Sequence, residues 1–336
     1  MTSQERIELQ ERPLPSLKDH EVLVQNLFSL VSPGTELSIY LGTHTGLRDP
    51  NNSWAKYPFI PGYAAIGKIT QIGKNVSLLR EEELIYYFGH HAAFEILDPQ
   101  NALFVRLTPS RGVPLEHFLF ARLLQIAYTS VAVAHSQPRQ VLVTGAGLIG
   151  LCAAQLFQNE GTSQVMVLDK NTKRLQIARD CGIFDTINSS FGNPEQEIRR
   201  LTGGQGVDMV IEATGVPALV PLALEWVNKR GEIILLGSTR GNVELDVYRL
   251  IHSKGAVVTG AHEMLIPLLP RDGKPNKVEI TEKIMLWIAE KKLKIGPLIS
   301  HILSPDQSAE IYRGLSREQD KYWGVVLDWG RVNGVR

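Results

Sequence analysis

Residues 141–150 read VLVTGAGLIG, and this stretch decides the fold class. It joins an apolar, β-branched run to a helical pattern through Gly145, Gly147 and Gly150, which stand in GxGxxG spacing. The first glycine permits a tight turn, the second lets a pyrophosphate approach the backbone, and the third lets helix and strand pack closely. The helix N-terminus adds free N–H groups and a positive dipole. The stretch therefore predicts a dinucleotide-binding βαβ unit.

An acidic residue follows at the end of the next predicted strand. Asp169 lies 19 residues after Gly150, where a carboxylate can accept hydrogen bonds from the adenosine ribose. The same carboxylate repels a 2′-phosphate, so we expect NAD(H) rather than NADP(H), although Lys173 and neighbouring basic residues could soften the repulsion. The residues expected to bind the cofactor are Gly145, Gly147, Leu148, Ile149, Gly150, Asp169, Lys170, Arg174, Thr214, Gly215, Gly237 and Ser238.

The order of the patterns along the chain predicts two domains. Between residues 140 and 260, six β-branched runs alternate with helical stretches, a rhythm typical of a doubly wound parallel α/β sheet, the Rossmann type. The first 130 residues are rich in glycine, proline and alternating strand patterns, which predicts an all-β domain. The C-terminal elements are too few for a core of their own. We therefore expect one domain from 1–129 and 262–336, and a dinucleotide-binding domain over 130–261.

Composition excludes several other classes of protein. Lys and Arg number 35, Asp and Glu also 35, and the charges are scattered, which argues against nucleic acid or membrane as a partner. No signal-like start and no apolar run of roughly 18 residues is present, so we expect a soluble, cytoplasmic protein. The cysteines, Cys152 and Cys181, are too few for a disulfide framework or a four-thiolate zinc site, and Cys152 is expected in the core.

Taken as a whole, the layout resembles the medium-chain dehydrogenase/reductase superfamily, which contains the zinc-type alcohol and polyol dehydrogenases. The resemblance covers nearly the full chain and implies a GroES-like catalytic domain beside the Rossmann domain. It is also loosely similar to the subgroup containing the bacteriochlorophyllide hydroxyethyl dehydrogenase, through PGTE, YPFIPGY and VVLDW, but this likeness indicates no substrate. The stretches that carry the main resemblance are 33–42, 61–76, 145–150, 169–182, 206–215 and 230–237.

The resemblance implies that this chain has lost the catalytic zinc. Zinc-dependent members have Cys where this chain has Pro33, His where it has Tyr63, Glu at Ala64, and a Cys or acidic ligand near Gln125. Proline and alanine have no donor atom, and a phenol or an amide is a poor zinc ligand beside thiolate and imidazole. A structural zinc is not expected either, because residues 1–151 contain no Cys.

Three residues are candidate catalytic groups: Tyr63, Thr35 and His262. Tyr63 replaces a family ligand, so its hydroxyl could donate a proton or a hydrogen bond in the active-site cleft, or its ring could only fill the vacated space. Thr35 lies where the family has its relay hydroxyl, and could instead bond the backbone of a turn. His262 follows the strand whose backbone should meet the nicotinamide amide, and an imidazole exchanges protons near neutral pH.

Five further residues are candidates for the substrate pocket. Glu36 follows Thr35 and is expected to bind structure more than substrate. His91 belongs to a His90-His91 pair expected on a short strand, where one of the two side chains must face outward. The remaining three are Gln125, and His44 and Trp54 in a long loop that could cover the substrate.

These observations predict an enzyme with a small-molecule substrate, namely an NAD(H)-dependent, zinc-independent oxidoreductase that interconverts a secondary alcohol and its ketone. One alternative is a zinc-free reductase of a conjugated C=C or C=N bond, and another is a catalytically silent NAD-binding protein. We expect a homodimer formed through the Rossmann domain, in the stretch 243–260 that reads VELDVYRLIHSKGAVVTG, because relatives pair their sheets at that edge.

Overall fold

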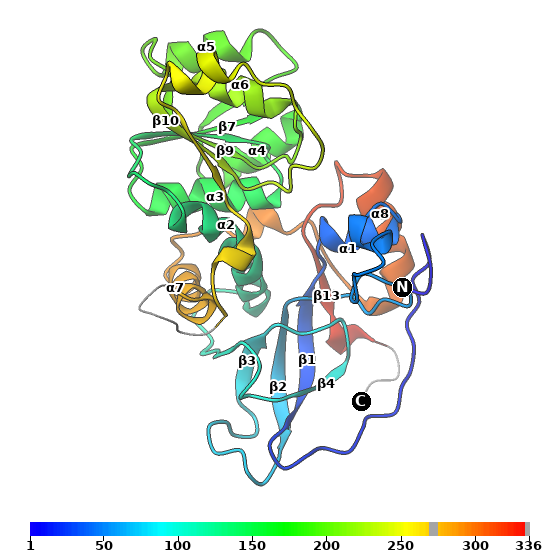
Figure 1. Cartoon of the computed structure of the whole chain (residues 1–336). Helices are drawn as coiled ribbons and strands as arrows, with labels where there is room; N and C mark the ends of the chain where they lie inside the picture. The colour runs from blue at the N-terminus through cyan, green and yellow to red at the C-terminus, as the bar shows by residue number, and fades with distance from the viewer. Residues whose placement is uncertain (269–274, 333–336) are drawn as a thin grey trace. The chain divides into compact units, whose positions relative to one another are not determined.

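The structure, a computed structural model, describes residues 1–268 and 275–332. The chain forms two compact units (Figure 1). The first unit consists of Met1–Arg122 and Leu298–Arg336, and the second unit of Leu123–Pro297.

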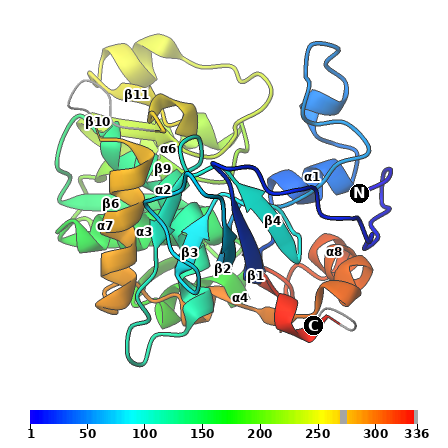
Figure 2. The ribbon, with the colours of Figure 1, turned by 90° about the horizontal axis from the view of Figure 1, so that it is seen from below.

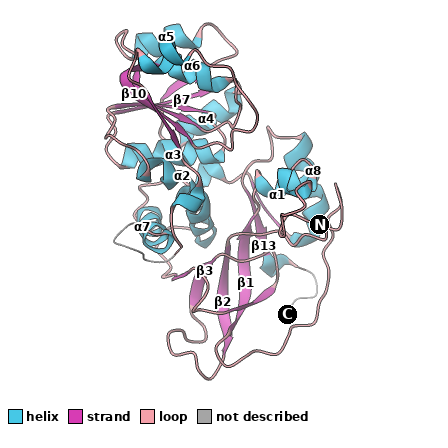
Figure 3. Cartoon of the chain, in the orientation of Figure 1, coloured by secondary structure: helices cyan, strands magenta, loops and turns pink. Residues whose placement is uncertain are grey.

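The second unit is built on a parallel sheet, as predicted. Its strand order is β11-β10-β9-β6-β7-β8, so the order reverses between β6 and β9, the switch point at which doubly wound sheets bind ligands. Helices cover both faces (Figure 3). The strands are β6 (Gln140–Thr144), β7 (Gln164–Asp169), β8 (Asp185–Asn188), β9 (Val207–Glu212), β10 (Val227–Leu235) and β11 (Val257–Gly260). The helices are α2 (Ala121–Ala132), α3 (Leu148–Asn159), α4 (Thr172–Asp180), α5 (Pro194–Leu201), α6 (Leu219–Trp226) and α7 (Lys277–Ala289), with short turns at Tyr248–His252 and Glu263–Leu265.

The sheet is buried because its strands are apolar on both faces. Successive residues of β6, Val141 to Val143, are all fully buried, as are Val210 and Ile211 of β9. This continuous run of apolar side chains is what a strand covered by helices on both sides requires. Cys152 of α3 is also fully buried, which confirms its expected place in the core.

The first unit contains a mixed sheet of the described strands in the order β12-β13-β1-β2-β3-β5, with β4 also paired to β1. The strands are β1 (Val22–Leu30), β2 (Ala65–Ile72), β3 (Leu84–Tyr87), β4 (Phe94–Leu97), β5 (Phe104–Arg106), β12 (His301–Leu303) and β13 (Val325–Asp328). Strand β13 from the end of the chain pairs with β1, with Phe28 opposite Asp328. The C-terminal segment therefore completes the N-terminal sheet.

The first unit is not purely β. The helix α1 (Thr35–Tyr40) forms within the stretch expected to be strand and turn, and α8 (Ser308–Arg317) packs beside it in a shared apolar cluster. Short turns of this unit lie at Thr45–Leu47, Leu115–Phe120, Pro305–Gln307 and Trp329–Arg331, and a further turn, Gly296–Leu298, ends at the first residue of its C-terminal segment.

The boundary between the units differs from the expected domain boundary near α7. Lys283 of α7 lies 2.8 Å from Glu160 and 2.9 Å from the Tyr128 hydroxyl, and its Nζ lies 4.6 Å from the ring centroid of Trp287. Figure 2 shows α7 beside α2 and α3. These contacts assign α7 to the second unit, whereas the sequence pattern predicts that residues 262–297 belong with the N-terminal domain. Part of the Pro-rich link before α7, residues 269–274, lies outside the described residues.

Candidate functional site

The glycine loop of the second unit has the backbone geometry that its sequence predicts. Gly145 has a φ of +94°, a conformation that side chains rarely adopt. A Cβ atom on Gly150 would lie 1.9 Å from the Gly145 carbonyl oxygen, so helix α3 could not pack this closely with any other residue there. A Cβ atom on Gly147, in contrast, would meet nothing within 4 Å. The space beside Gly147, at the N-terminus of α3, is open to an incoming group.

Asp169 is held beside this loop at the end of β7. Its Oδ2 accepts a hydrogen bond from the Ala146 N–H at 2.7 Å, and its Oδ1 accepts one from the Asn171 N–H at 2.8 Å. A carboxylate has about four acceptor positions, so these two bonds leave capacity for ribose hydroxyls. Lys170 is exposed, and Arg174 is half-buried in the first turn of α4. The residues therefore fit the adenosine end of a nicotinamide dinucleotide.

Glu212 organises the other side of the expected cofactor site, and the sequence analysis missed it. Its fully buried carboxylate accepts hydrogen bonds from the Thr214 N–H at 2.8 Å, the Gly215 N–H at 3.1 Å and the Thr239 hydroxyl at 3.0 Å. A Cβ on Gly237 would lie 2.4 Å from the Gly215 nitrogen. Glu212 thus links the turn after β9 to the turn after β10 through hydrogen bonds. The signal that could have found it is an acid at the end of an otherwise apolar strand.

In the first unit, Tyr63 precedes β2 and points a buried hydroxyl into the protein. That hydroxyl makes no hydrogen bond of ordinary geometry, although the Ser32 hydroxyl is close enough to act on it. Burial, and next the Glu36 carboxylate, raise the pKa of Tyr63 well above its usual value, against smaller opposing effects of Arg122 and Ser32. Tyr63 is therefore a neutral phenol at physiological pH, able to donate a hydrogen bond but not to act as a tyrosinate base.

Glu36 lies at the start of α1 and is the centre of a buried hydrogen-bond network. Its side chain accepts bonds from the Gly62 N–H at 3.2 Å, the Tyr312 hydroxyl at 2.5 Å and His91 Nε2 at 3.2 Å. Because Gly62 directly precedes Tyr63, this carboxylate anchors the backbone that carries Tyr63. The prediction that Glu36 binds structure agrees with these contacts.

His91 joins Glu36 to the C-terminal segment through Ser29. Its Nδ1 lies 2.8 Å from the Ser29 Oγ, which also accepts a bond from Trp329 Nε1 at 2.9 Å. All of these groups are satisfied if His91 Nε2–H donates to Glu36 while the Ser29 hydroxyl donates to Nδ1. His91 is thereby held in one orientation.

The prediction that His90 and His91 lie on a strand is wrong. Both residues lie in the loop between β3 and β4, where Gly89 and the Glu95 contacts interrupt the strand pattern. The expectation of one outward side chain still agrees with the structure. His90 is 55% exposed and pairs with Glu95 at 2.7 Å, whereas His91 is 6% exposed.

The other candidates are distributed over both units. Thr35 is exposed at the first position of α1. His44 is buried, accepts the Gly46 N–H and meets the half-exposed Trp54 edge-on, with ring centroids 5.1 Å apart. In the second unit, Gln125 is buried in α2, while His262 is exposed and accepts the Met264 N–H at 3.2 Å. The structure thus brings together Tyr63, Glu36 and His91 within the first unit.

The residues present do not fit a catalytic zinc ion. Pro33 and Ala64 have no donor atom, and the Tyr63 hydroxyl lies near the cationic Arg122. Over residues 1–268 and 275–332, no three His, Cys, Asp or Glu side chains gather in a way that could hold a metal ion.

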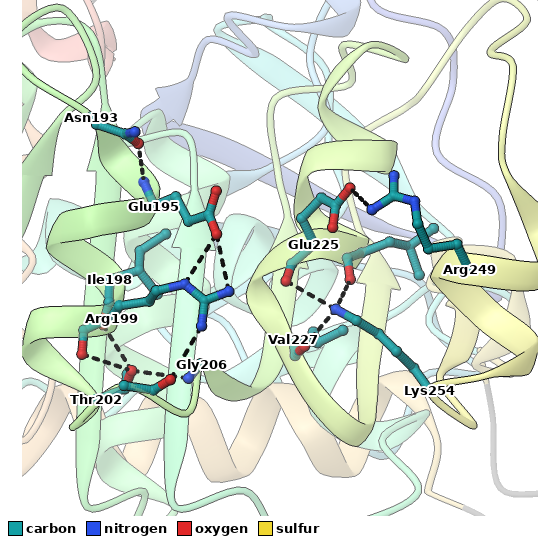
Figure 4. Close-up of polar contacts among 12 residues, drawn as sticks. Asn193, Glu195, Ile198, Arg199, Thr202, Gly206, Glu225, Val227, Arg249 and Lys254 are labelled. Carbon is teal, nitrogen blue, oxygen red and sulfur yellow. Dashed lines mark hydrogen bonds and ion pairs between the residues drawn. The ribbon is translucent and has the colours of Figure 1, made fainter.

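A pocket of about 160 Å³ lies in the second unit at the opposite ends of the strands from the glycine loop, where Gly206 precedes β9 and Val227 begins β10. Figure 4 shows Glu195 paired with Arg199 and Glu225 paired with Arg249 at this pocket. Lys254 donates to the carbonyls of Leu224, Glu225 and Val227 at 2.6–3.0 Å, which caps the end of α6. Because all three ammonium hydrogens of Lys254 are used in these bonds, we assign a structural role to this pocket.

In the described ranges, no helix combines the length and the apolar composition that a bilayer-crossing segment requires.

Comparisons with known proteins agree with this reading of the fold. Residues 149–267 match the family model described as "Zinc-binding dehydrogenase". The L-threonine 3-dehydrogenase of Bacillus licheniformis is 26% identical over 278 residues, which cover 74% of this chain and 78% of that protein. The enzyme of the same name from Vibrio cholerae is 30% identical over 190 residues, 56% of this chain, and the match spans about half (51%) of its own length.

Solved dehydrogenase structures have the same fold over about 97% of this chain. Galactitol-1-phosphate dehydrogenase from Escherichia coli superposes with a TM-score of 0.81 at 22% identity, covering 97% of this chain and 98% of that one. An Escherichia coli alcohol dehydrogenase complexed with NADH gives 0.78 at 20%, covering 97% of each chain. A zinc-binding dehydrogenase from Sinorhizobium meliloti bound to NADP gives 0.75 at 17%, again covering 97% of each. The prediction of a Rossmann and GroES-like dehydrogenase fold is confirmed, as is the prediction of an oxidoreductase.

Proposed function

We propose that this medium-chain dehydrogenase-type oxidoreductase interconverts a secondary alcohol and its ketone with NAD(H) and without a catalytic zinc ion. The observation that carries the proposal is the glycine loop of the second unit with the Asp169 carboxylate held beside it. The nicotinamide, when bound, accepts hydride from the alcohol carbon or returns hydride to the ketone carbon. Reduction consumes one ketone, one NADH and one proton and yields one alcohol and one NAD⁺, so atoms and charge balance.

Asp169 supports NAD(H) as the preferred cofactor. Its carboxylate is buried and fixed by two backbone N–H groups, so it cannot easily turn away from a 2′-phosphate. Repulsion between two anions in such a site disfavours NADP(H). The solved relatives include both an NADH and an NADP complex, so the fold alone does not favour either cofactor, and Asp169 is the residue that supports NAD(H).

A secondary alcohol is the substrate class that best agrees with the relatives. The matched curated proteins are named for dehydrogenation of L-threonine at position 3, and the carbon that bears the side-chain hydroxyl of threonine is secondary. Galactitol 1-phosphate also carries secondary hydroxyl groups. We therefore propose a secondary alcohol as the substrate of this chain, without proposing any of these particular compounds.

We assign the handling of the substrate oxygen to Tyr63. Because the phenol stays protonated, it donates a hydrogen bond to that oxygen and stabilises charge that develops there. Thr35 and His262 are exposed and can exchange protons with water, so they are the proposed carriers of the proton that the balance requires. His262 Nδ1 accepts a backbone N–H, which leaves its Nε2 to carry the exchangeable proton.

The edge of the second unit supports the proposed homodimer. Strand β11 is the last strand of its sheet, and its residues Val257 and Val258 are 38% and 40% exposed. Tyr248, in the same proposed interface, is 72% exposed. An open strand edge with exposed apolar side chains is commonly covered by another chain.

The deciding experiment measures NADH consumption with matched panels of ketones, conjugated enones and imines. Ketone reduction, with reversal by the corresponding alcohol and NAD⁺, is the expected result. Turnover of enones or imines alone would instead establish the C=C or C=N reductase. NADH binding without turnover of any panel would identify a silent dinucleotide-binding protein.

A further inference from the structure

The carboxylate of Glu212, at the end of β9, has no exposed surface, and its hydrogen bonds run to two turns. Its Oε1 accepts bonds from the Thr214 N–H at 2.8 Å and the Gly215 N–H at 3.1 Å, and also from the Thr214 hydroxyl. Its Oε2 accepts one from the Thr239 hydroxyl at 3.0 Å. A carboxylate offers about four acceptor positions, and these bonds use them. The Glu212 side chain is therefore fully engaged in holding the turn after β9 to the turn after β10.

The main chain of Glu212 makes the same connection. Its carbonyl oxygen accepts hydrogen bonds from the Leu236 N–H at 2.9 Å and the Gly237 N–H at 2.7 Å. A Cβ atom on Gly215 would lie 3.0 Å from the Ser238 carbonyl oxygen, so the two turns are in direct contact. The backbone and the side chain of one residue thus fix the two turns against each other.

These turns lie on the side of the glycine loop away from Asp169. The strand order is β10-β9-β6-β7, so the glycine loop after β6 has Asp169 of β7 on one side and Glu212 of β9 on the other. The turn after β9 also touches this loop, because a Cβ atom on Gly145 would lie 2.8 Å from Thr214 Cγ2. Dinucleotides lie across such a switch point, with the pyrophosphate at the glycine loop. With the adenosine half beside Asp169, the nicotinamide half would reach the turns that Glu212 holds.

We propose that Glu212 is a positioning residue for the nicotinamide half of the cofactor. The inference rests on the proposed function and adds the residue that shapes this half of the site. Because the bonds of Glu212 are made within the chain, they fix both turns in advance, and little ordering is left for cofactor binding to drive. Loss of the carboxylate leaves the Thr214 and Gly215 N–H groups without their acceptor, so the turns rearrange. The adenosine half depends on Asp169 and the glycine loop, and keeps its contacts.

The test compares two ligands on the full-length protein by calorimetric titration: NADH, which contains both halves, and ADP, which contains only the adenosine half with the diphosphate. Glu212→Leu removes the acceptors with little change in side-chain volume. It should weaken NADH binding at least tenfold and ADP binding by less than about twofold.

Glu232→Leu is the matched control. Glu232 is also a buried carboxylate, 3% exposed, and accepts a backbone N–H from His135 at 3.1 Å and a hydroxyl from Thr259 at 2.8 Å. It lies opposite Val257 at the start of β11, whereas the glycine loop lies at the carboxyl ends of the parallel strands. The control should therefore bind NADH and ADP like the wild type.

Stability separates positioning from a purely structural role. Both Leu variants should unfold at a lower urea concentration than the wild type, because each leaves backbone N–H groups without an acceptor. Only Glu212→Leu should lose NADH affinity. Unchanged NADH affinity in Glu212→Leu would overturn the inference. An equal loss of NADH and ADP affinity, or a similar loss of NADH affinity in Glu232→Leu, would also overturn it, because the effect would then not be confined to the nicotinamide half.

A second variant applies if Glu212→Leu fails to fold. Thr239→Val keeps the carboxylate and removes only its side-chain bond to the turn after β10. It should weaken NADH binding at least about threefold and leave ADP binding unchanged, and an unchanged NADH affinity would overturn the inference. A wild type that binds NADH through Glu212 but reduces no ketone would refute the proposed function and retain the positioning role.

Discussion

The Nε2 nitrogen of His91 lies 3.2 Å from the Oε2 oxygen of Glu36, and both side chains are almost completely buried. This pair connects the loop between β3 and β4 to the first turn of α1. Tyr312, from α8 near the end of the chain, donates to the same carboxylate oxygen. Three segments that are distant in sequence are thus joined at one carboxylate beside the backbone of Tyr63.

Tyr312→Phe tests the strength of this connection. The change keeps the ring but removes one of the donors to a buried carboxylate, so we expect the free energy of unfolding to fall by about 1.5–3 kcal/mol. Urea denaturation measures the change. Ser16→Ala is the control, because it removes the hydroxyl of an exposed residue, and it should alter stability by less than about 0.5 kcal/mol. Equal stabilities of the two variants would contradict the role given to Tyr312.

Tyr63→Phe separates catalysis from packing. The change deletes a buried hydroxyl that has no hydrogen-bond partner, so stability should stay unchanged or rise slightly. If the hydroxyl assists hydride transfer, kcat should fall by about 10²- to 10⁴-fold, a barrier increase of roughly 3–5 kcal/mol. A loss of less than about threefold, with cofactor binding intact, would mean that the ring only fills space. The rate of His262→Ala shows whether His262 also carries the proton.

The free energy of unfolding of Tyr63→Phe should also depend on pH differently from that of the wild type. Burial, and then Glu36, raise the pKa of Tyr63 in the folded protein above the value of about 10 in the unfolded chain. The folded state therefore keeps its proton longer, and the stability from this group is complete below pH 10 and lost as the pH rises further. Unfolding free energies between pH 9 and 11 should fall less steeply in Tyr63→Phe than in the wild type. A change in rate between pH 6 and 9 that depends on the Tyr63 hydroxyl would contradict the assignment of Tyr63 as a neutral phenol in this range.

Removal of metal should not affect activity. Since Pro33 and Ala64 provide no donor and Arg122 brings a positive charge near Tyr63, we expect no stoichiometric zinc after purification and full turnover after dialysis against a strong chelator. Elemental analysis and steady-state rates are the measurements. One tightly bound zinc per chain, with activity lost on its removal, would refute zinc independence.

Asp169→Ser should change the cofactor preference. Without the carboxylate, the ratio of Kd values that favours NAD(H) over NADP(H) should fall by about tenfold or invert. The variant also loses two acceptors of backbone N–H groups, so stability should fall by about 1–3 kcal/mol.

Asp208→Ser is the matched control for Asp169. Asp208 also accepts two backbone N–H bonds, from Arg139 and Gln140, but at the other end of the sheet. It should lose similar stability and keep the wild-type cofactor preference. A wild type that prefers NADP(H) would overturn the role assigned to Asp169.

Self-association should depend on the β11 edge. Val258→Lys places a charge on that exposed edge and should convert a dimer into a monomer at micromolar concentration, measured by sedimentation. Phe184→Lys is the control, because Phe184 is 76% exposed beside β8 at the opposite edge of the sheet. It should leave the dimer intact. A monomeric wild type would contradict the proposed interface.

Local patterns were sufficient to predict the parallel sheet of the second unit, but not that α7 belongs to this unit. Alternation of apolar strands and helices, and the spacing of Gly145, Gly147 and Gly150, depend on backbone conformation within about 30 residues, which is information that the sequence carries directly. Asp169 was found for the same reason, because its distance from the glycine loop is set by one βαβ unit. Glu212 ends an apolar strand, which is a local signal, but its bonds to the turns after two different strands depend on how β9 and β10 pair in the folded sheet.

In the first unit, the sequence by itself determined which metal-binding atoms are missing, since Pro33 and Ala64 have no donor in any fold. Only the tertiary structure decided what surrounds Tyr63. Arg122, Tyr86 and Tyr312 come from separate parts of the chain, and their positions near Tyr63 depend on strand pairing in the sheet and on the return of α8 to the N-terminal unit. The physical reason is that electrostatic effects on a buried phenol depend on distances in space, and these bear no fixed relation to separation in sequence.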